Sequence, residues 1–183
     1  ASAFAAGPAL LILLSFILRK FTNFDPGDKP IQTLAKIVAY GAIANLFFFG
    51  CEVFVAAYSQ IPEHTAHLKY LFFGLHGHGV LVPWMWSSIA LVLAAIVLLL
   101  IPSARQNNAV LGVACAFIFI GIWIDKGLGM ISGGFIPNPL HEITEYVPSV
   151  PEVTITIGVY AVGFLVLTLL YKVVVGVKEE VGG

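Results

Sequence analysis

Five long apolar runs constrain the fold of this chain more than any other feature. They cover residues 2–18, 31–58, 82–101, 108–124 and 153–175. A helix that crosses the hydrocarbon of a bilayer needs roughly 20 mostly apolar residues, and these runs are long enough. They are continuous and rich in leucine and alanine, without the alternation of a membrane barrel strand. The sequence therefore predicts an all-α integral membrane protein with about five transmembrane helices.

Composition excludes several other classes of protein. Of the 183 residues, 59% are hydrophobic and 10% are charged, whereas soluble domains carry about 25% charged residues. A soluble core of this size could not bury so much apolar surface. The net charge of −1 argues against nucleic acid as a partner. Cys51 and Cys115 lie inside apolar runs without a ligand spacing, so we expect no iron–sulfur cluster and no metal site.

The first residues, Ala-Ser-Ala-Phe, contain neither a methionine nor the charged region that precedes the apolar part of a signal peptide. We therefore interpret residues 1–183 as a single membrane domain that forms part of a longer protein.

Lysine and arginine predict the orientation of the helices. In an up-and-down arrangement, seven of the nine fall on one side: Arg19, Lys20, Lys29, Lys36, Arg105, Lys172 and Lys178. Lys69 and Lys126 fall on the other side. Cytoplasmic loops carry an excess of lysine and arginine, so the first side is expected to be cytoplasmic. The sequence thus predicts a multi-pass protein of a prokaryotic cytoplasmic membrane, with segments 59–81 and 125–152 facing outward.

This orientation places the histidines near the outer face. They are His64, His67, His76, His78 and His141. The cytoplasmic half of each helix is nearly free of ionisable groups, whereas a channel or proton pump needs polar residues through the full thickness of the membrane. The pattern suits a site near one surface. Within it, we interpret His64 and His67 as solvated loop residues.

Glu52 lies in the outer third of the second run, between apolar and aromatic neighbours. A carboxylate at that depth is costly when it is charged and unpaired. One interpretation is a functional carboxyl group that exchanges protons. The other is a structural carboxyl group bound to a neighbouring helix, for which Lys126 is a candidate partner. Asn45, seven residues earlier, falls on the same helix face and extends the polar stripe.

His76 and His78 are separated by one glycine. On a regular helix they would point in different directions and could not hold one metal ion together. The glycines around them predict irregular backbone, which a membrane tolerates where that backbone lines a cavity. His78 is a candidate proton-exchanging imidazole beside a polar headgroup, and the alternative is an interfacial histidine in contact with water. No histidine lies in the middle of a predicted helix, so haem is not expected.

Three further features belong to the outer face. Trp84, Trp86 and Trp123 are typical of an interfacial aromatic belt. Asp125 and Lys126 form either an ion pair at the rim or a polar gate. Segment 125–152 is rich in glycine and proline but too apolar for a free linker, so we expect an ordered cap.

The segments FFGLHGHGVLVPWMW, GIWIDKGLGMISGGFIPNPLHEITEYVPSVPE and ASAFAAGPALL resemble the NrfD/PsrC superfamily of membrane subunits. The nearest likeness is to the DsrP-type subunit of the DsrMKJOP complex of dissimilatory sulfate reducers. The likeness covers the whole chain but only the C-terminal half of such a protein. It implies a four-helix bundle plus one helix, which is half of a ten-helix NrfD-like fold.

The resemblance also implies a function. Such subunits bind no haem or cluster, and they exchange electrons between membrane menaquinol and a periplasmic, ferredoxin-like iron–sulfur subunit. Some of their complexes also contain a multihaem cytochrome c and other membrane subunits. The quinone site of related subunits lies in the N-terminal bundle, so no quinone ligand is transferred to a residue of this chain.

The sequence therefore predicts a quinol-interacting subunit of an oxidoreductase complex that handles protons near the outer face. The candidate proton-handling residues are Glu52, His78, Asp125, Lys126 and Glu145. The candidate quinone contacts are His76, His78, Trp84 and Glu52. Two alternatives stay open. One is a structural anchor for redox subunits without chemistry in this half, and the other is a transporter unrelated to redox.

Overall fold

The computed structural model describes residues 1–22, 27–59, 61–75, 77–135 and 149–181. In this part of the chain the structure is helical, and it contains an isolated bridge between Leu75 and His78 but no strand. Five of the described helical segments are long and apolar enough to cross a membrane: Ser2–Phe21, Asp28–Ser59, Val82–Leu100, Asn108–Ile131 and Val150–Val173. The prediction of an all-α membrane fold is confirmed.

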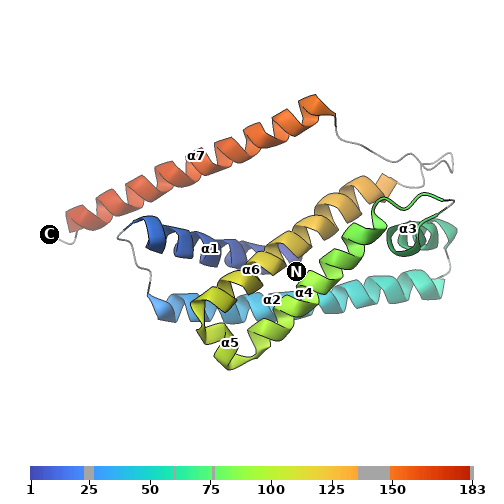
Figure 1. Cartoon of the computed structure of the whole chain (residues 1–183), viewed down its shortest axis with the longest axis horizontal. Coiled ribbons are helices and arrows are strands. Elements are labelled where there is room, and N and C mark those ends of the chain that lie inside the picture. Colours follow the sequence, from blue (N-terminus) through green and yellow to red (C-terminus); the bar gives the residue numbers. More distant parts are fainter. Residues whose placement is uncertain (23–26, 60, 76, 136–148, 182–183) are drawn as a thin grey trace. The chain divides into compact units, whose positions relative to one another are not determined.

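The elements follow one another along the chain in the order labelled in Figure 1. In order they are α1 (Ser2–Phe21), α2 (Asp28–Ser59), α3 (Pro62–Phe73), α4 (Val82–Leu100), α5 (Pro102–Gln106), α6 (Asn108–Trp123), the π-helix η1 (Ile124–Ser132), the 3₁₀-helix η2 (Gly133–Phe135) and α7 (Val150–Val181). They divide into two compact units, Ala1–Glu145 and Tyr146–Gly183.

The second unit contains α7, whose membrane span has a mean hydropathy of 2.3. Its first turn is closed by a capping box, because the Ser149 backbone N–H and hydroxyl each donate to Glu152 Oε2 at 2.7 Å. This local pairing fixes where the apolar run becomes helical.

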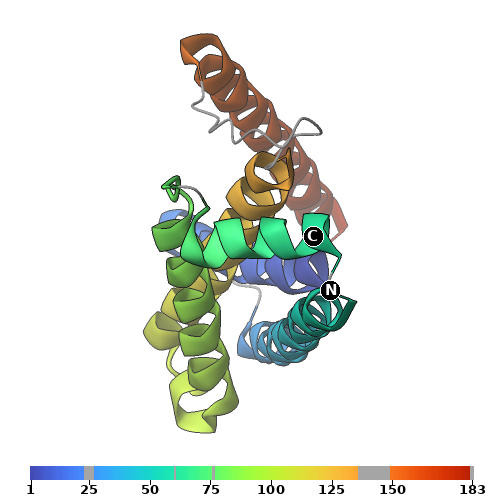
Figure 2. The same cartoon turned by 90° about the vertical axis from the view of Figure 1, so that its right-hand side faces the viewer.

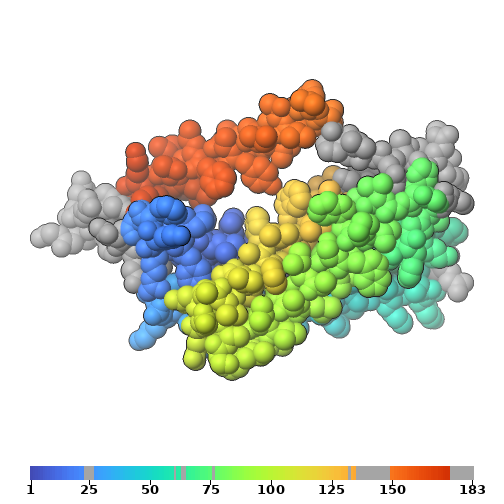
Figure 3. Space-filling model, viewed as in Figure 1, coloured from blue at the N-terminus to red at the C-terminus, as the bar shows by residue number. Residues whose placement is uncertain are grey.

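In the first unit, α1, α2, α4 and α6 form a four-helix bundle around one apolar core. Small residues bring α1 and α2 together: a Cβ added at Gly41 would lie 3.2 Å from the Ala5 Cα atom. Membrane helices use small residues in this way because close packing, rather than expulsion of water, drives their association. On the face shown in Figure 3, the side chains of α4 and α6 form one continuous surface.

One end of the bundle, which we call the α5 end, carries several polar connections. Arg19 at the end of α1 forms an ion pair with Asp28 at the start of α2, with 3.2 Å between Nη1 and Oδ1. Gln32 donates to the Arg105 carbonyl oxygen at 3.0 Å, which ties α2 to α5. Asn107 caps α6, because its side-chain oxygen accepts the Ala109 N–H at 3.0 Å.

The opposite end, which we call the α3 end, is crossed by α3 (Figure 2). The sequence indicated only a connecting segment there. Two local signals mark its ends: Pro62 stands in its first turn, and Gly74 ends it. The Phe72 ring packs edge-on against Trp86 and Phe49 at centroid distances of 5.9 and 6.0 Å, and the Trp86 indole N–H donates to the Phe72 carbonyl oxygen.

Gly74 and Gly77 explain why the turn after α3 is rich in glycine. Gly74 has φ 78° and ψ 161°, a region that essentially only glycine occupies. A Cβ there would lie 2.7 Å from the His78 carbonyl oxygen, whose bond from the Leu75 N–H closes the turn. Gly77 has φ 86°, but a Cβ at Gly77 would meet nothing within 4 Å.

This contrast gives a testable pair of substitutions. Gly74→Ala is expected to cost about 3 kcal/mol, since it combines a strained backbone with a collision against backbone. Gly77→Ala is expected to cost about 1 kcal/mol, because only the left-handed conformation is penalised. Thermal unfolding of the detergent-solubilised protein measures both, and equal melting temperatures would contradict the geometry of this turn.

The fourth apolar run continues further than the sequence indicated. We expected a helix over 108–124 followed by the cap, but η1 and η2 prolong the helical path to Phe135. Gly127 and Gly129 belong to the glycine-rich segment that the sequence assigned to the cap, yet both lie inside the π-helix. Asp125 and Lys126 consequently lie within a helical span rather than in a loop. Residues 136–148 of the expected cap lie outside the described residues.

Candidate functional site

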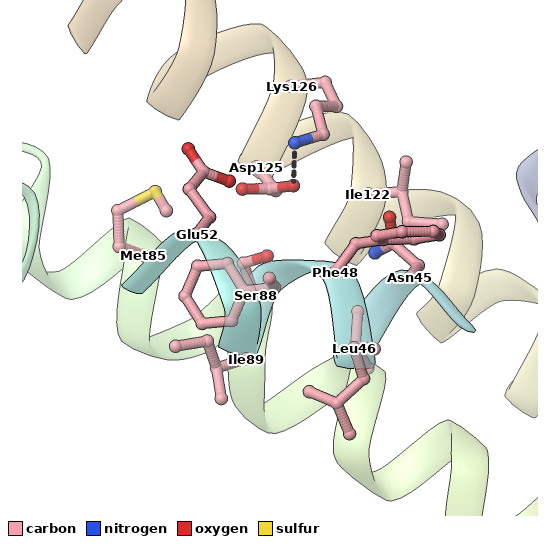
Figure 4. Close-up of a pocket in the computed structure, with 12 residues that line it drawn as sticks. Asn45, Leu46, Phe48, Glu52, Met85, Ser88, Ile89, Ile122, Asp125 and Lys126 are labelled. Carbon is pink, nitrogen blue, oxygen red and sulfur yellow. Dashed lines mark ion pairs between the residues drawn. The ribbon is translucent and has the colours of Figure 1, made fainter. Parts of the chain in front are cut away.

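A pocket of about 80 Å³ lies between α2, α4, α6 and η1. A volume of this size holds several water molecules or a small polar group. Its lining, most of which is labelled in Figure 4, consists of Asn45, Leu46, Phe48, Phe49, Glu52, Met85, Ser88, Ile89, Val92, Ile122, Asp125 and Lys126. The polar part of this set combines two carboxyl groups, one amine, one amide and one hydroxyl inside an apolar frame.

Asp125 and Lys126 supply the charged pair of the pocket from η1. The Lys126 Nζ atom lies 3.0 Å from the Asp125 Oδ2 atom, and the two side chains are 40% and 21% exposed. A π-helix is rare and frequently marks a functional position. Of the two interpretations for these residues, an ion pair is what the structure shows, and this ion pair faces the pocket (Figure 4).

Glu52 reaches the same pocket from α2. Its carboxyl group is turned toward the side of the pocket that holds Asp125 (Figure 4). Within the part of the chain that the structure describes, Glu52 forms no ion pair, since Lys126 is paired with Asp125. The pocket thus contains two acids and one ammonium group.

Asn45 and Ser88 complete the polar lining. Asn45 lies two helical turns before Glu52, on the face of α2 where the sequence placed it. Ser88 is buried, and its hydroxyl donates to the Gly121 carbonyl oxygen at 2.7 Å. Because that bond uses the only hydroxyl proton, the Ser88 oxygen can still accept a hydrogen bond from the pocket. The same bond fastens α4 to α6.

Met85 closes the pocket toward the α3 end. It is buried in a cluster with Tyr70 and Leu71 of α3, and it also lines the pocket. A Cβ added at Gly129 would lie 2.8 Å from the Met85 sulfur atom. The glycine therefore lets η1 approach α4 closely enough to hold Asp125 beside the pocket.

The structure brings together three of the predicted site residues: Glu52, Asp125 and Lys126. His78 and Trp84 do not line this pocket. His78 is exposed, and its backbone exchanges two hydrogen bonds with Leu75 at 2.9 Å. The roles assigned to these two residues stay predictions, as do those of His76 and Glu145, which lie outside the described residues.

His67 lies elsewhere than we expected. The sequence indicated a solvated loop residue, but the structure places His67 in α3 with a buried Nδ1 atom that has no hydrogen-bond partner. Sequence reasoning also missed Ser88 and Met85. The signal that could have found Ser88 is a small hydroxyl residue in a helix that is otherwise strongly apolar.

Metal chemistry has no visible site in the described ranges. Among these residues, no group of three or more histidine, cysteine, aspartate or glutamate side chains could hold a metal ion. The polar side chains of the pocket can donate and accept hydrogen bonds.

Comparisons with known proteins identify similar chains. The family model described as "Polysulphide reductase, NrfD" matches residues 1–136. The integral membrane subunit of menaquinone reductase from Nitratidesulfovibrio vulgaris is 24% identical over 175 residues, which cover 93% of this chain and 41% of that protein. A putative membrane subunit of dimethyl sulfoxide reductase from Halobacterium salinarum is 22% identical over 192 residues, with 91% and 42% covered. The chain thus spans about two fifths of the length of these curated relatives. No solved structure matches at a significant level.

Proposed function

We propose that this chain, which belongs to the NrfD family, is part of a quinol- or quinone-interacting membrane subunit of a respiratory electron-transfer complex. The printed names of its relatives, a menaquinone reductase subunit and a dimethyl sulfoxide reductase subunit, support this class of complex. The proposed location is a prokaryotic cytoplasmic membrane, with the α3 end facing outward as the lysine and arginine distribution indicates. A DsrP-type complex of sulfur metabolism is the narrower proposal.

The observation that carries the proposal is the pocket in which Glu52 faces the Asp125–Lys126 ion pair. Oxidation of a quinol yields the quinone, two electrons and two protons. The electrons pass to an iron–sulfur partner subunit, to which a multihaem cytochrome c is attached in some complexes. The protons need acceptors, and a carboxylate beside an ammonium group can take one of them. Reduction of a quinone runs the same steps in reverse.

Each polar group of the pocket has a role in this proposal. Glu52 exchanges the proton. Lys126 pairs with Asp125 at membrane depth, where a lone charge is costly. Asn45 and Ser88 offer hydrogen bonds to water in the pocket. His78 and Glu145 extend the proton route, and His76, His78, Trp84 and Glu52 are the proposed contacts to the quinone ring.

Glu52→Gln tests this function, because glutamine keeps the shape and hydrogen bonds of the side chain but cannot exchange a proton. In the native complex, purified through a tag on this subunit, oxidation of menadiol by ferricyanide is expected to slow at least tenfold; general acid–base groups contribute about 10²–10⁴-fold. Tyr58→Phe, an exposed position at the end of the same helix, is the matched control and should leave the rate unchanged.

The composition of the purified complex separates the two interpretations of this half of the protein. A slow Glu52→Gln complex with all its subunits supports proton handling. A Glu52→Gln complex that keeps all its subunits and also its full rate would favour the structural-anchor interpretation, in which this chain only holds redox subunits at the membrane.

A further inference from the structure

His67 occupies the centre of the inner face of α3. Side chains three and four residues apart share a helix face, so His67 lies beside Tyr70 and Leu71. Both of these neighbours are buried, at 1% and 4% exposure. Lys69 and Phe73 occupy the opposite face and are exposed. The imidazole therefore lies on the side of α3 that faces the bundle.

The two sides of the His67 ring have different environments. Its Nδ1 atom is inaccessible and has no hydrogen-bond partner, whereas the residue as a whole is only partly buried. A buried polar atom without a partner costs about 1–3 kcal/mol, and native proteins retain few of them. Leucine at this place would avoid that cost. A polar ring that reaches from the interior toward the surface suits a group that transfers protons between the two.

Only one layer of side chains separates this face of α3 from the pocket. Tyr70 and Leu71 form a buried cluster with Met85, and Met85 itself lines the pocket that holds Glu52. Of these three residues, Leu71 and Met85 have aliphatic and thioether side chains, and Tyr70 carries a hydroxyl group. Nδ1 itself has no room for a water molecule beside it, so the imidazole or a neighbouring side chain must rotate to admit one before Nδ1 can exchange a proton with the pocket side.

The elements that pack against α3 are α2, α4 and η2. The sequences of α4 and η2 contain no titratable or charged side chain. In the outer third of α2 the titratable side chains are Cys51, Glu52 and Tyr58. Among these three elements, Glu52 is thus the carboxyl group at the α3 end of the bundle, and α3 itself contains Glu63 one turn before His67.

We propose that His67 is a proton-relay residue between the pocket and the aqueous phase at the α3 end. This inference rests on the proposed function and adds the exit of its protons. Nδ1 takes a proton from water on the pocket side, and Nε2 releases one on the outer side. The ring is then neutral with its proton on Nδ1, and a ring flip or proton exchange with water restores the starting tautomer, so the cycle consumes no oxidant, reductant or other reactant.

Two substitutions at this position distinguish a relay from a structural role. His67→Leu removes the unsatisfied nitrogen and keeps an apolar filling of similar volume. His67→Gln keeps the capacity to hydrogen-bond but cannot carry a proton through a ring. A relay requires both variants to lose function, whereas a packing role tolerates leucine and a hydrogen-bonding role tolerates glutamine. Lys69→Gln, on the exposed face of the same helix, is the matched control.

The measurement is proton release during menadiol oxidation by ferricyanide, followed with a pH-indicator dye in the native complex. Both His67 variants are expected to release protons at least tenfold more slowly, in complexes that retain all their subunits. In His67→Gly, added imidazole is expected to restore most of the rate, which a structural role would not predict. Lys69→Gln should behave as the wild type.

The outcomes separate this inference from the proposed function. Wild-type proton release in either His67→Leu or His67→Gln overturns the relay. If only Glu52→Gln is slow, the proposed function stands and the relay fails. If only the His67 variants are slow, the pocket is not the inner end of the route and the inference fails with the proposed function. Where a variant does not assemble, the glycine variant is measured with and without imidazole. A rate that imidazole fails to restore counts against the relay.

Discussion

Replacement of Lys126 by methionine is expected to lower menadiol-dependent turnover of the native complex by about 100-fold, which corresponds to about 2.7 kcal/mol. The change leaves the Asp125 carboxylate without the ammonium group that lies 3.0 Å away. Breaking a buried pair by removing one partner costs roughly 3–5 kcal/mol, and the remaining exposure of Lys126 reduces that figure. The unpaired carboxyl group of Asp125 then lies beside Glu52 in the pocket and is expected to disturb its proton exchange.

The double variant Asp125→Asn/Lys126→Met tests this explanation. It removes both charges, and replacing a buried pair by neutral groups costs far less than breaking it. Turnover of the double variant is therefore expected to exceed that of Lys126→Met by about tenfold. If the double variant is as slow as the single one, Lys126 acts on the proton itself rather than through Asp125, and the proposed role of the ion pair is wrong.

The ion pair at the α5 end provides the matched control. Arg19 and Asp28 lie 3.2 Å apart, but their side chains are 32% and 72% exposed. Exposed pairs are worth about 0–1 kcal/mol. Arg19→Met should thus leave turnover within about twofold of the wild type. Similar losses in Arg19→Met and Lys126→Met would show that turnover responds to any broken ion pair.

The number of membrane-spanning helices and their positions in the sequence could be predicted, because they depend on length and polarity alone. Each span is a run of apolar residues long enough to cross the hydrocarbon, and no tertiary contact is needed to recognise it. The same logic placed Glu52, Asp125 and Lys126 near one face. Their meeting in one pocket could not be derived from the sequence, since it depends on how α2 and η1 turn about their axes when they pack.

The structure of α3 and η1 was missed for two physical reasons. The twelve residues of α3 are too few and too polar for a span, so a hydropathy pattern indicates a connection. Their helix depends on burying Tyr70 and Leu71 against Met85, which is a tertiary effect. In η1, Gly127 and Gly129 belong to the segment whose glycine content indicated a cap, but Gly129 lies against Met85, where an added Cβ would be 2.8 Å from the sulfur atom.

Gly121→Leu is expected to destabilise the bundle by about 3 kcal/mol, the upper range for overpacking a well-packed interior. A Cβ at this position would lie 2.8 Å from Val92 Cγ2 and 3.2 Å from the Ser88 carbonyl oxygen. Neither atom can yield easily, because valine is held in one helical rotamer and the other atom belongs to backbone. Thermal unfolding of the detergent-solubilised protein measures the loss.

Gly112→Ala on the same helix is the matched control, since its Cβ would meet the Phe16 ring at an ordinary 3.5 Å. It should be neutral or slightly stabilising, because alanine favours helix over glycine by about 1 kcal/mol. Gly121→Ala combined with Val92→Ala should recover most of the stability that Gly121→Ala alone loses.

The Ser88 hydroxyl bonds to the Gly121 carbonyl oxygen and also lines the pocket, so separating α4 from α6 displaces a polar group of the site. Gly121→Leu is therefore expected to slow menadiol oxidation even in the fraction that stays folded. A folded fraction with the wild-type rate would show that this contact stabilises the bundle without positioning the pocket.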